Sequence, residues 1–214
     1  KTRELQCDAI TINVQWNPAR IASTGASIDK ETIAKRPCFL CDANRPKEQT
    51  KKIIDEHFEL LVNPFPILPT HVTIPSLRHE PQRILGNYGE IFNLLDEYPE
   101  MMVFYNGPKC GASAPDHAHL QAGTNGLLPL QNAWQRLSRN LTLLVAAEGD
   151  DEQHSGIFRI SHYPCPAYLV TAETDEEMMR LFLLLYHTLP RPAGEDEPMM
   201  NVVAWRESKE SPVT

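Results

Sequence analysis

The stretch GASAPDHAHLQAG (residues 111–123) places His117, His119 and Gln121 at alternate positions, directly after a loop of small residues. Successive side chains of a β-strand point to opposite faces of its sheet. In a strand, these three polar side chains would share one face and the apolar residues between them would share the other. Two interpretations are open: a solvated strand face that carries two histidines, or a functional site built from imidazoles and an amide.

The rest of the chain alternates predicted strands and helices. Alternating or short apolar runs bounded by turn residues predict strands, and apolar residues at helical spacing predict helices. We expect strands at residues 9–16, 59–63, 71–76, 101–106, 117–123, 156–161, 167–172 and 197–205. We expect helices at residues 83–99, 130–148 and 175–189. Paired strands followed by helices indicate an α+β fold with helices packed on an antiparallel sheet.

Composition excludes several functional classes. The chain of 214 residues carries a formal net charge of −8, whereas a nucleic-acid-binding surface usually shows a basic excess, so we expect no nucleic-acid partner. The most apolar run, residues 181–189, is too short to span a bilayer, and we expect no membrane partner. Five cysteines with one close pair do not resemble a secreted disulfide framework, so we expect a cytoplasmic protein.

The one close cysteine pair lies in RPCFLCDANRP (residues 36–46), where Cys38 and Cys41 have the C-x-x-C spacing. One short turn can present two such thiolates to a single metal ion. A redox pair or two core cysteines are the alternatives, but the prolines around the motif favour a loop over the helix start that a redox pair needs. No second C-x-x-C exists, so histidines would have to complete a zinc site: His79 and one of the 117/119 pair.

The segment YNGPKCGAS (residues 105–113) precedes the histidine stretch and carries glycines, Lys109 and Ser113. Such loops let backbone N–H groups approach a phosphate closely, although an ordinary surface turn is the alternative. A neutral imidazole is nucleophilic near pH 7 without a separate base. A phosphate loop that leads into a histidine strand therefore predicts attack at phosphorus, with a phosphoramidate product. Gln121 could hold a phosphate oxygen but could not relay a proton.

The combined pattern G-[small]-S-x-P…H-x-H-x-Q resembles the nucleotidyltransferase branch of the histidine-triad (HIT) superfamily, in which a glutamine replaces the third histidine of the hydrolases. That branch includes galactose-1-phosphate uridylyltransferase, diadenosine tetraphosphate phosphorylase and GDP-hexose phosphorylases. CFLCDANRP (residues 38–46) is similar to the zinc segment of the uridylyltransferases, and residues 63–82 are similar to the nucleotide-pocket strands. The resemblance covers about residues 36–123 and implies a HIT-like α+β fold.

The resemblance also implies roles for individual residues. His119 matches the nucleophile that accepts the nucleotidyl group, and Gln121 matches the glutamine that steadies the covalent intermediate. The implied Zn²⁺ ligands are Cys38, Cys41, His79 and His117. The implied substrate contacts are Ser113, Asn106 and Lys109 in the phosphate loop, Asn63 and Phe65 in the nucleoside pocket, and Arg20 at a phosphate. The implied substrate is a nucleotide-sugar or a dinucleoside polyphosphate, together with a phosphate-bearing acceptor.

Two features depart from the family pattern. Asp116 adds a residue between Ser113 and His117, so the loop must bulge. We divide the chain into a catalytic lobe at residues 1–130 and remaining α+β elements at 131–214, which are too few for a complete second HIT-like half. A homodimer is one arrangement that could complete the site. A HIT-type hydrolase, a zinc-stabilised nucleotide-binding module without catalysis and a thiol redox protein are the alternative functions.

Overall fold

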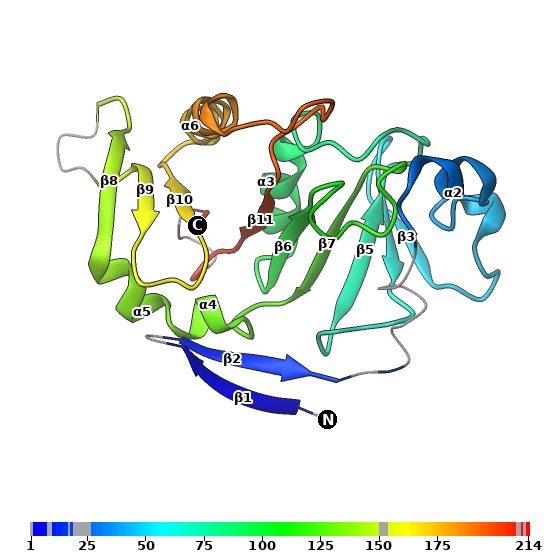
Figure 1. The fold of residues 1–214 in the computed structure, drawn as a ribbon, viewed down its shortest axis with the longest axis horizontal. Coiled ribbons are helices and arrows are strands. Elements are labelled where there is room, and N and C mark those ends of the chain that lie inside the picture. Colours follow the sequence, from blue (N-terminus) through cyan, green and yellow to red (C-terminus); the bar gives the residue numbers. More distant parts are fainter. Residues whose placement is uncertain are drawn as a thin grey trace.

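A computed structural model describes residues 2–7, 10–16, 18, 27–149, 154–208, 211 and 213–214. Its centre is a six-stranded sheet in the order β11-β6-β7-β5-β4-β3, in which every neighbouring pair is antiparallel. The strands are β3 (Lys51–Ile53), β4 (Glu59–Val62), β5 (His71–Pro75), β6 (Met101–Asn106), β7 (His119–Thr124) and β11 (Asn201–Ala204). β7 lies in the middle of this sheet, where both of its edges are paired (Figure 1).

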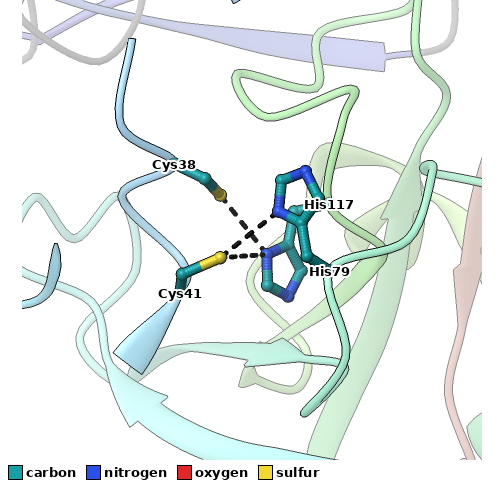
Figure 2. A group of neighbouring side chains, drawn as sticks. All are labelled: Cys38, Cys41, His79 and His117. Carbon is teal, nitrogen blue, oxygen red and sulfur yellow. Dashed lines mark hydrogen bonds between the residues drawn. The ribbon is translucent and has the colours of Figure 1, made fainter. Parts of the chain in front are cut away.

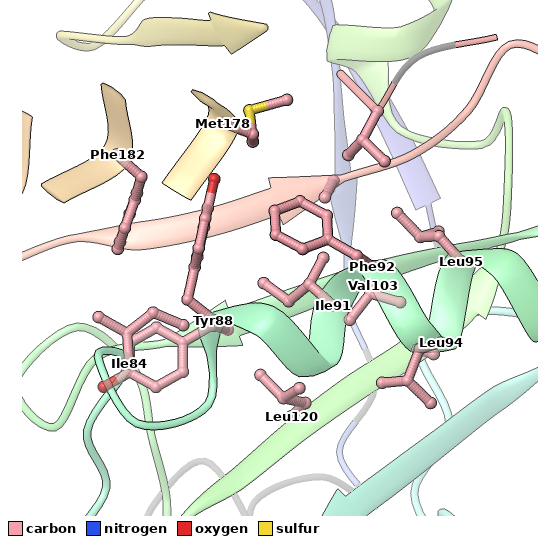
Figure 3. Packing of buried hydrophobic residues seen from close by; sticks show 14 of the residues in the cluster. Ile84, Tyr88, Ile91, Phe92, Leu94, Leu95, Val103, Leu120, Met178 and Phe182 are labelled. Atoms are coloured by element: carbon pink, nitrogen blue, oxygen red, sulfur yellow. The ribbon is translucent and has the colours of Figure 1, made fainter. Parts of the chain in front are cut away.

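Helices α3 (Tyr88–Glu97) and α6 (Asp175–Thr188) cover one face of the sheet. Leu120 and Ala122 of β7 are buried in that core with Val103 of β6. The rings of Tyr88 and Phe182 stack at 3.7 Å between centroids and join the two helices (Figure 3). The Thr174 hydroxyl accepts from the backbone N–H of Glu177 and caps α6. The α+β class with an antiparallel sheet is therefore confirmed.

A second sheet has three antiparallel strands in the order β10-β9-β8: β8 (Leu141–Ala146), β9 (Gly156–Ile160) and β10 (Tyr168–Thr171). The chain then passes through α6 and returns as β11, which pairs with β6. Residues from both sides of the expected boundary at 130 therefore share the six-stranded sheet. The division into two lobes stays a prediction.

Shorter elements complete the described structure. β1 (Thr2–Cys7) and β2 (Ile10–Gln15) form a hairpin, with Ile10 buried against α4 (Pro129–Asn132) and α5 (Trp134–Leu137). The helix α2 (Lys30–Lys35) and the short 3₁₀ turn η2 (Asp42–Asn44) flank the C-x-x-C motif, and η3 (Ser138–Asn140) follows α5. No helix within these described ranges combines the length and the apolarity needed to cross a bilayer.

Three expected elements differ from the structure. The helix expected over 130–148 is wrong beyond η3, because Leu141, Leu143 and Val145 alternate with exposed residues as strand β8. The helix expected from residue 83 begins at Tyr88, since the segment that contains Gly86 forms turns. β7 begins at His119, so His117 lies in the bend before the strand and does not share its face.

Candidate active site and metal centre

Four side chains from three separate segments of the chain lie together near the start of β7: Cys38, Cys41, His79 and His117 (Figure 2). Their ligand atoms all lie within 4.8 Å of one another. Sγ of Cys38 is 3.3 Å from Nδ1 of His117, and Sγ of Cys41 is 3.2 Å from Nδ1 of His79. Zn–S and Zn–N bonds of about 2.3 and 2.0 Å place S and N about 3.5 Å apart around a tetrahedral ion. The four residues fit a Cys₂His₂ zinc site.

The second nitrogen of each histidine is also engaged. Nε2–H of His117 donates to the backbone carbonyl of Ser76 at 2.8 Å, which leaves Nδ1 unprotonated on the side that faces the thiols. Nε2 of His79 lies 3.8 Å from the carboxylate of Asp116, which Arg36 holds at 3.1 Å. A hydrogen bond such as that of His117 fixes the tautomer and orientation of a metal-ligating histidine, whereas the 3.8 Å contact at His79 is electrostatic only. Asp116, the additional residue of the loop, therefore lies beside the candidate metal ligand His79.

The electrostatics of the cluster favour a thiolate. Burial opposes ionisation of Cys38, but hydrogen bonds from His117 and from the backbone of Leu40 and Cys41 together outweigh it and lower the pKa of this thiol to about 6. Burial and the neighbouring Cys38 raise the pKa of the Cys41 thiol, because two thiolates repel each other when no cation lies between them. A divalent cation would remove that repulsion, since thiolates are the form that binds zinc.

His119 opens β7 and is buried, with 7% of its surface exposed. Its Nδ1 lies 2.8 Å from the backbone carbonyl of His117, so Nδ1 carries the proton and donates it. The lone pair of the neutral ring is consequently on Nε2. Burial lowers the pKa of His119 to about 4, which keeps the ring neutral at pH 7.

Gln82 fixes the backbone at His119, and sequence reasoning missed it. Its Oε1 accepts from the N–H of His119 at 2.7 Å, while its Nε2 donates to the carbonyls of His119 and Asn106, both at 3.0 Å. The side chain is only 1% exposed. Its position in RHEPQ, beside the zinc-ligand candidate His79, was the only signal for it. Gln82 therefore ties the start of β7 to the end of β6.

His71 fixes Gln121 and was also missed as a site residue. The backbone N–H of Ile67 donates to Nδ1 of His71 at 3.2 Å, so the proton of this ring is on Nε2. Nε2–H then donates to Oε1 of Gln121 at 3.0 Å. With its oxygen engaged, Gln121 presents its amide N–H₂ group as a donor. His119 and Gln121 alternate with Leu120, so both point away from the helix-covered face.

The other residues that the resemblance implies as substrate contacts lie in different surroundings. Asn63 donates to Thr73, which is the neighbour of Gln121 across the sheet, and accepts from the backbone of the half-exposed Phe65. The backbone carbonyl of Ser113 accepts from Arg36 at 3.1 Å. Lys109 lies 3.8 Å from the carboxylate of Glu195, which forms an ion pair with it. Arg20 lies outside the described residues.

The loop that contains Lys109 has a packing reason for its first glycine. A Cβ on Gly107 would lie 2.6 Å from the carbonyl of Met200, to which the N–H of Gly107 donates at 3.1 Å. Gly111 has φ = +109°, a conformation that favours glycine. Asn106 precedes this loop at the end of β6. The glycines thus shape the loop and dock it on β11, whatever the loop binds.

Sequence comparison assigns the family. The family described as "Domain of unknown function (DUF4922)" matches residues 1–124, more than half of the chain. The chain belongs to that family. The match in this DUF4922 protein includes the C-x-x-C motif, His79 and the whole H-x-H-x-Q segment. No curated protein matches the chain.

Solved structures similar to this DUF4922 protein include three of yeast Ap4A phosphorylase Apa2. One is 16% identical with a TM-score of 0.44 and covers 100% of this chain and 69% of that chain. A complex with AMP is 18% identical with a TM-score of 0.48 and covers 95% and 67%. A complex with Ap4A is 17% identical with a TM-score of 0.42 and covers 86% and 63%. Identities this low say nothing of a shared activity.

Proposed function

We propose that this DUF4922 protein is a nucleotidyltransferase or phosphorylase that works through a covalent nucleotidyl intermediate on His119. The observation that carries the proposal is the hydrogen bond from Nδ1 of His119 to the His117 carbonyl. It directs the lone pair to Nε2 and holds the ring in one orientation. A nucleophile needs both, because in-line attack depends on the position of the attacking atom.

In the first step, Nε2 of His119 attacks the phosphorus that carries the nucleoside. A P–N bond forms, the P–O bond to the leaving phosphate breaks, and the leaving oxygen keeps the electron pair. The Nδ1 proton stays on the ring and its bond to the His117 carbonyl stabilises the developing positive charge. In the second step a phosphate oxygen of the acceptor attacks the same phosphorus, the P–N bond breaks, and its electron pair returns to Nε2.

Gln121 would contact the phosphoryl oxygens through its amide N–H₂ group, since His71 engages the amide oxygen. An amide donates hydrogen bonds but has no proton to exchange near pH 7. Water therefore gains no general base from this residue, which favours an acceptor that is already an anion. Nucleotide-sugars and dinucleoside polyphosphates are the proposed donors, and phosphate or a sugar 1-phosphate is the proposed acceptor.

Cys38, Cys41, His79 and His117 would hold a zinc ion that stabilises the fold. Four protein ligands close a tetrahedral site, and closed sites are structural. The ion would fix the C-x-x-C loop and the backbone of His117, and through that backbone the ring of His119. No chemistry of the reaction is assigned to the ion itself.

The decisive experiment is to trap the intermediate without acceptor. The protein is incubated with UDP-glucose, GDP-mannose or diadenosine tetraphosphate, and its intact mass is measured. We expect a gain of one nucleoside monophosphate that is labile in acid, stable in base and maps to His119. His119→Ala should give no adduct, whereas His57→Ala, which changes an exposed histidine elsewhere, should label normally. An adduct on His117, or none with any donor, would contradict the proposal.

A further inference from the structure

A groove of about 630 Å³ opens at the end of β7 that is distant from His119. Aromatic, amide and hydroxyl side chains dominate its lining, which includes Trp134, Gln135, Ser138 and Trp205. Pockets of 300–1,000 Å³ are typical of small-molecule sites. Neither the family assignment nor the proposed chemistry gives this groove a role.

The groove lies on the same face of the sheet as the reactive histidine. Along β6, Val103 and Tyr105 join the helix-covered core, whereas Met102 and Phe104 join a separate cluster with Trp205. Phe104 is paired with Gln121 across the sheet and its ring centroid lies 5.8 Å from that of His71. Between Gln121 and the groove, Met102 and Phe104 are buried in a cluster with Leu68, Leu128 and Trp134, so the groove is separate from the site at His119. Figure 1 shows α4 and α5 at this end of β7 and α2 near the other.

The lining offers ring surfaces and neutral hydrogen-bond groups. The rings of Trp134 and Trp205 meet edge to face at 89°, with centroids 5.5 Å apart. Within the described part of the chain, neither indole N–H has a hydrogen-bond partner, and neither has the Gln135 amide or the Ser138 hydroxyl. Gln135 is exposed and Trp134 and Ser138 are half-buried, so these three side chains are available to a ligand, whereas Trp205 is buried behind them.

Three other lining residues, Asn125, Gln131 and Arg206, already have hydrogen-bond partners. Gln131 donates to the side chain of Asn125, which in turn donates to the backbone carbonyl of Arg206 at 2.9 Å. The guanidinium of Arg206 is paired with Asp96 and donates to the carbonyl of Ser211. The cation of the lining is therefore neutralised, and the exposed Glu207 adds a carboxylate, which together disfavour a phosphate group here. A flat, neutral ring with polar edges fits this lining best.

We propose that the groove binds a nucleobase. Aromatic side chains bind bases by stacking, and glutamine amides pair with base edges. The lining begins at Asn125, six residues after His119, and a strand rises about 3.3 Å per residue, so the groove begins about 20 Å from His119 along β7. A sugar one phosphate away from the reactive phosphorus is too short to span this distance. A nucleoside bound in the groove is therefore distinct from the one that His119 would accept.

This assignment does not rest on the proposed chemistry at His119, and the binding of a base can be tested alone. Adenosine, guanosine, cytidine, uridine and glucose are each titrated against the protein while tryptophan fluorescence is followed. We expect saturable quenching by at least one nucleoside and none by glucose. Gln135→Ala should weaken that binding about two- to tenfold. Asn132→Ala, in the preceding helix α4 and outside the groove lining, should bind normally.

Photolabelling locates the site. An azido derivative of the quenching nucleoside should label residues 125–138 or 205–207, and the label should persist in Asn63→Ala, which alters the expected nucleoside pocket near Gln121. Quenching by glucose alone, no quenching by any nucleoside, or labels confined to residues 63–75 would each overturn the assignment. Because the probes lack phosphate, failure of the covalent chemistry at His119 leaves this result unaffected, and the two failures are distinguishable.

Discussion

The Nδ1–H of His119 donates to the backbone carbonyl of His117, 2.8 Å away, while the ring of His117 faces the thiols of Cys38 and Cys41. One residue thus belongs to both sites: its side chain to the metal centre and its main chain to the candidate nucleophile. Variants that displace His117 should affect stability and reactivity together. Variants that act on either side of it should separate the two.

Cys38→Ser should remove most of the bound zinc and destabilise the fold. Cys38 is buried beside Leu40 and Ala114, and a structural metal contributes its binding energy to folding. We expect a loss of about 3 kcal/mol in the free energy of unfolding, or about 6–12 °C in the melting temperature of a domain of this size. Elemental analysis and thermal denaturation measure the two effects.

Cys165→Ser is the matched control for Cys38→Ser, because Cys165 is exposed and lies far from the cluster in sequence. It should retain about one equivalent of zinc and an unchanged melting temperature. A fully folded wild-type protein that contains no metal after purification would refute the ligand assignment, although the geometry at His119 would remain.

Asp116→Asn should weaken zinc binding while the loaded protein stays folded. The carboxylate faces Nε2 of His79 at 3.8 Å, and loss of such an outer partner typically costs 10- to 100-fold in metal affinity. Competition with a chromogenic chelator measures the affinity. Asp42→Asn changes an exposed carboxylate in the C-x-x-C segment and should have little effect. Equal affinities for the two variants would show that Asp116 does not support His79.

Gln82→Leu should slow formation of the His119 adduct more than it weakens nucleotide binding. The substitution leaves the N–H and carbonyl of His119 and the carbonyl of Asn106 without their partner. We expect a cost of about 2–4 kcal/mol in unfolding free energy. A small displacement of Nε2 should lower the labelling rate about 10- to 100-fold.

Urea denaturation, nucleotide titration and the time course of the mass shift give the three quantities for Gln82→Leu. Gln49→Leu removes a surface amide that donates to the carbonyl of Val62 and should leave the labelling rate unchanged. If Gln82→Leu lowers affinity and rate by the same factor, the residue holds the binding pocket and does not orient the nucleophile.

Local patterns together with the family resemblance were sufficient to predict the members of the Cys/His cluster. The C-x-x-C spacing and the alternation around Leu120 depend on neighbours in the chain, and the structure brings all four predicted ligands together. The alternation misplaced His117, whose backbone N–H donates to Ala114 in a turn that ends before β7 begins. Alternation of polar and apolar residues in the sequence cannot show at which residue a strand begins.

Gln82 and His71 could not be assigned from local sequence, because their roles depend on partners 37 and 50 residues away. A buried glutamine looks like any polar residue until the backbone groups opposite it are known. The prediction of a helix over Leu141–Ala146 was wrong for a related reason. The apolar residues of this segment fit a helix or a strand, and pairing with β9 decides between the two. Tertiary pairing supplies what these short patterns lack.

Gln121→His should raise the share of product formed by attack of water. In the wild type, Oε1 of Gln121 accepts from Nε2–H of His71, and the amide has no proton to exchange. An imidazole at this position can accept a proton from water, so hydrolysis of the His119 intermediate gains a general base. Gln121→Asn keeps an amide and should leave the partition unchanged even if it slows both routes. To measure the partition, the protein that carries the nucleotidyl group on His119 is mixed with phosphate in ¹⁸O-water. Nucleotide released by water carries ¹⁸O, and nucleotide released by phosphate does not. The fraction of nucleotide that carries ¹⁸O should rise severalfold for Gln121→His. The same fraction in wild type and Gln121→His would show that Gln121 does not separate transfer from hydrolysis, and the discrimination would then have to come from the acceptor's own binding site.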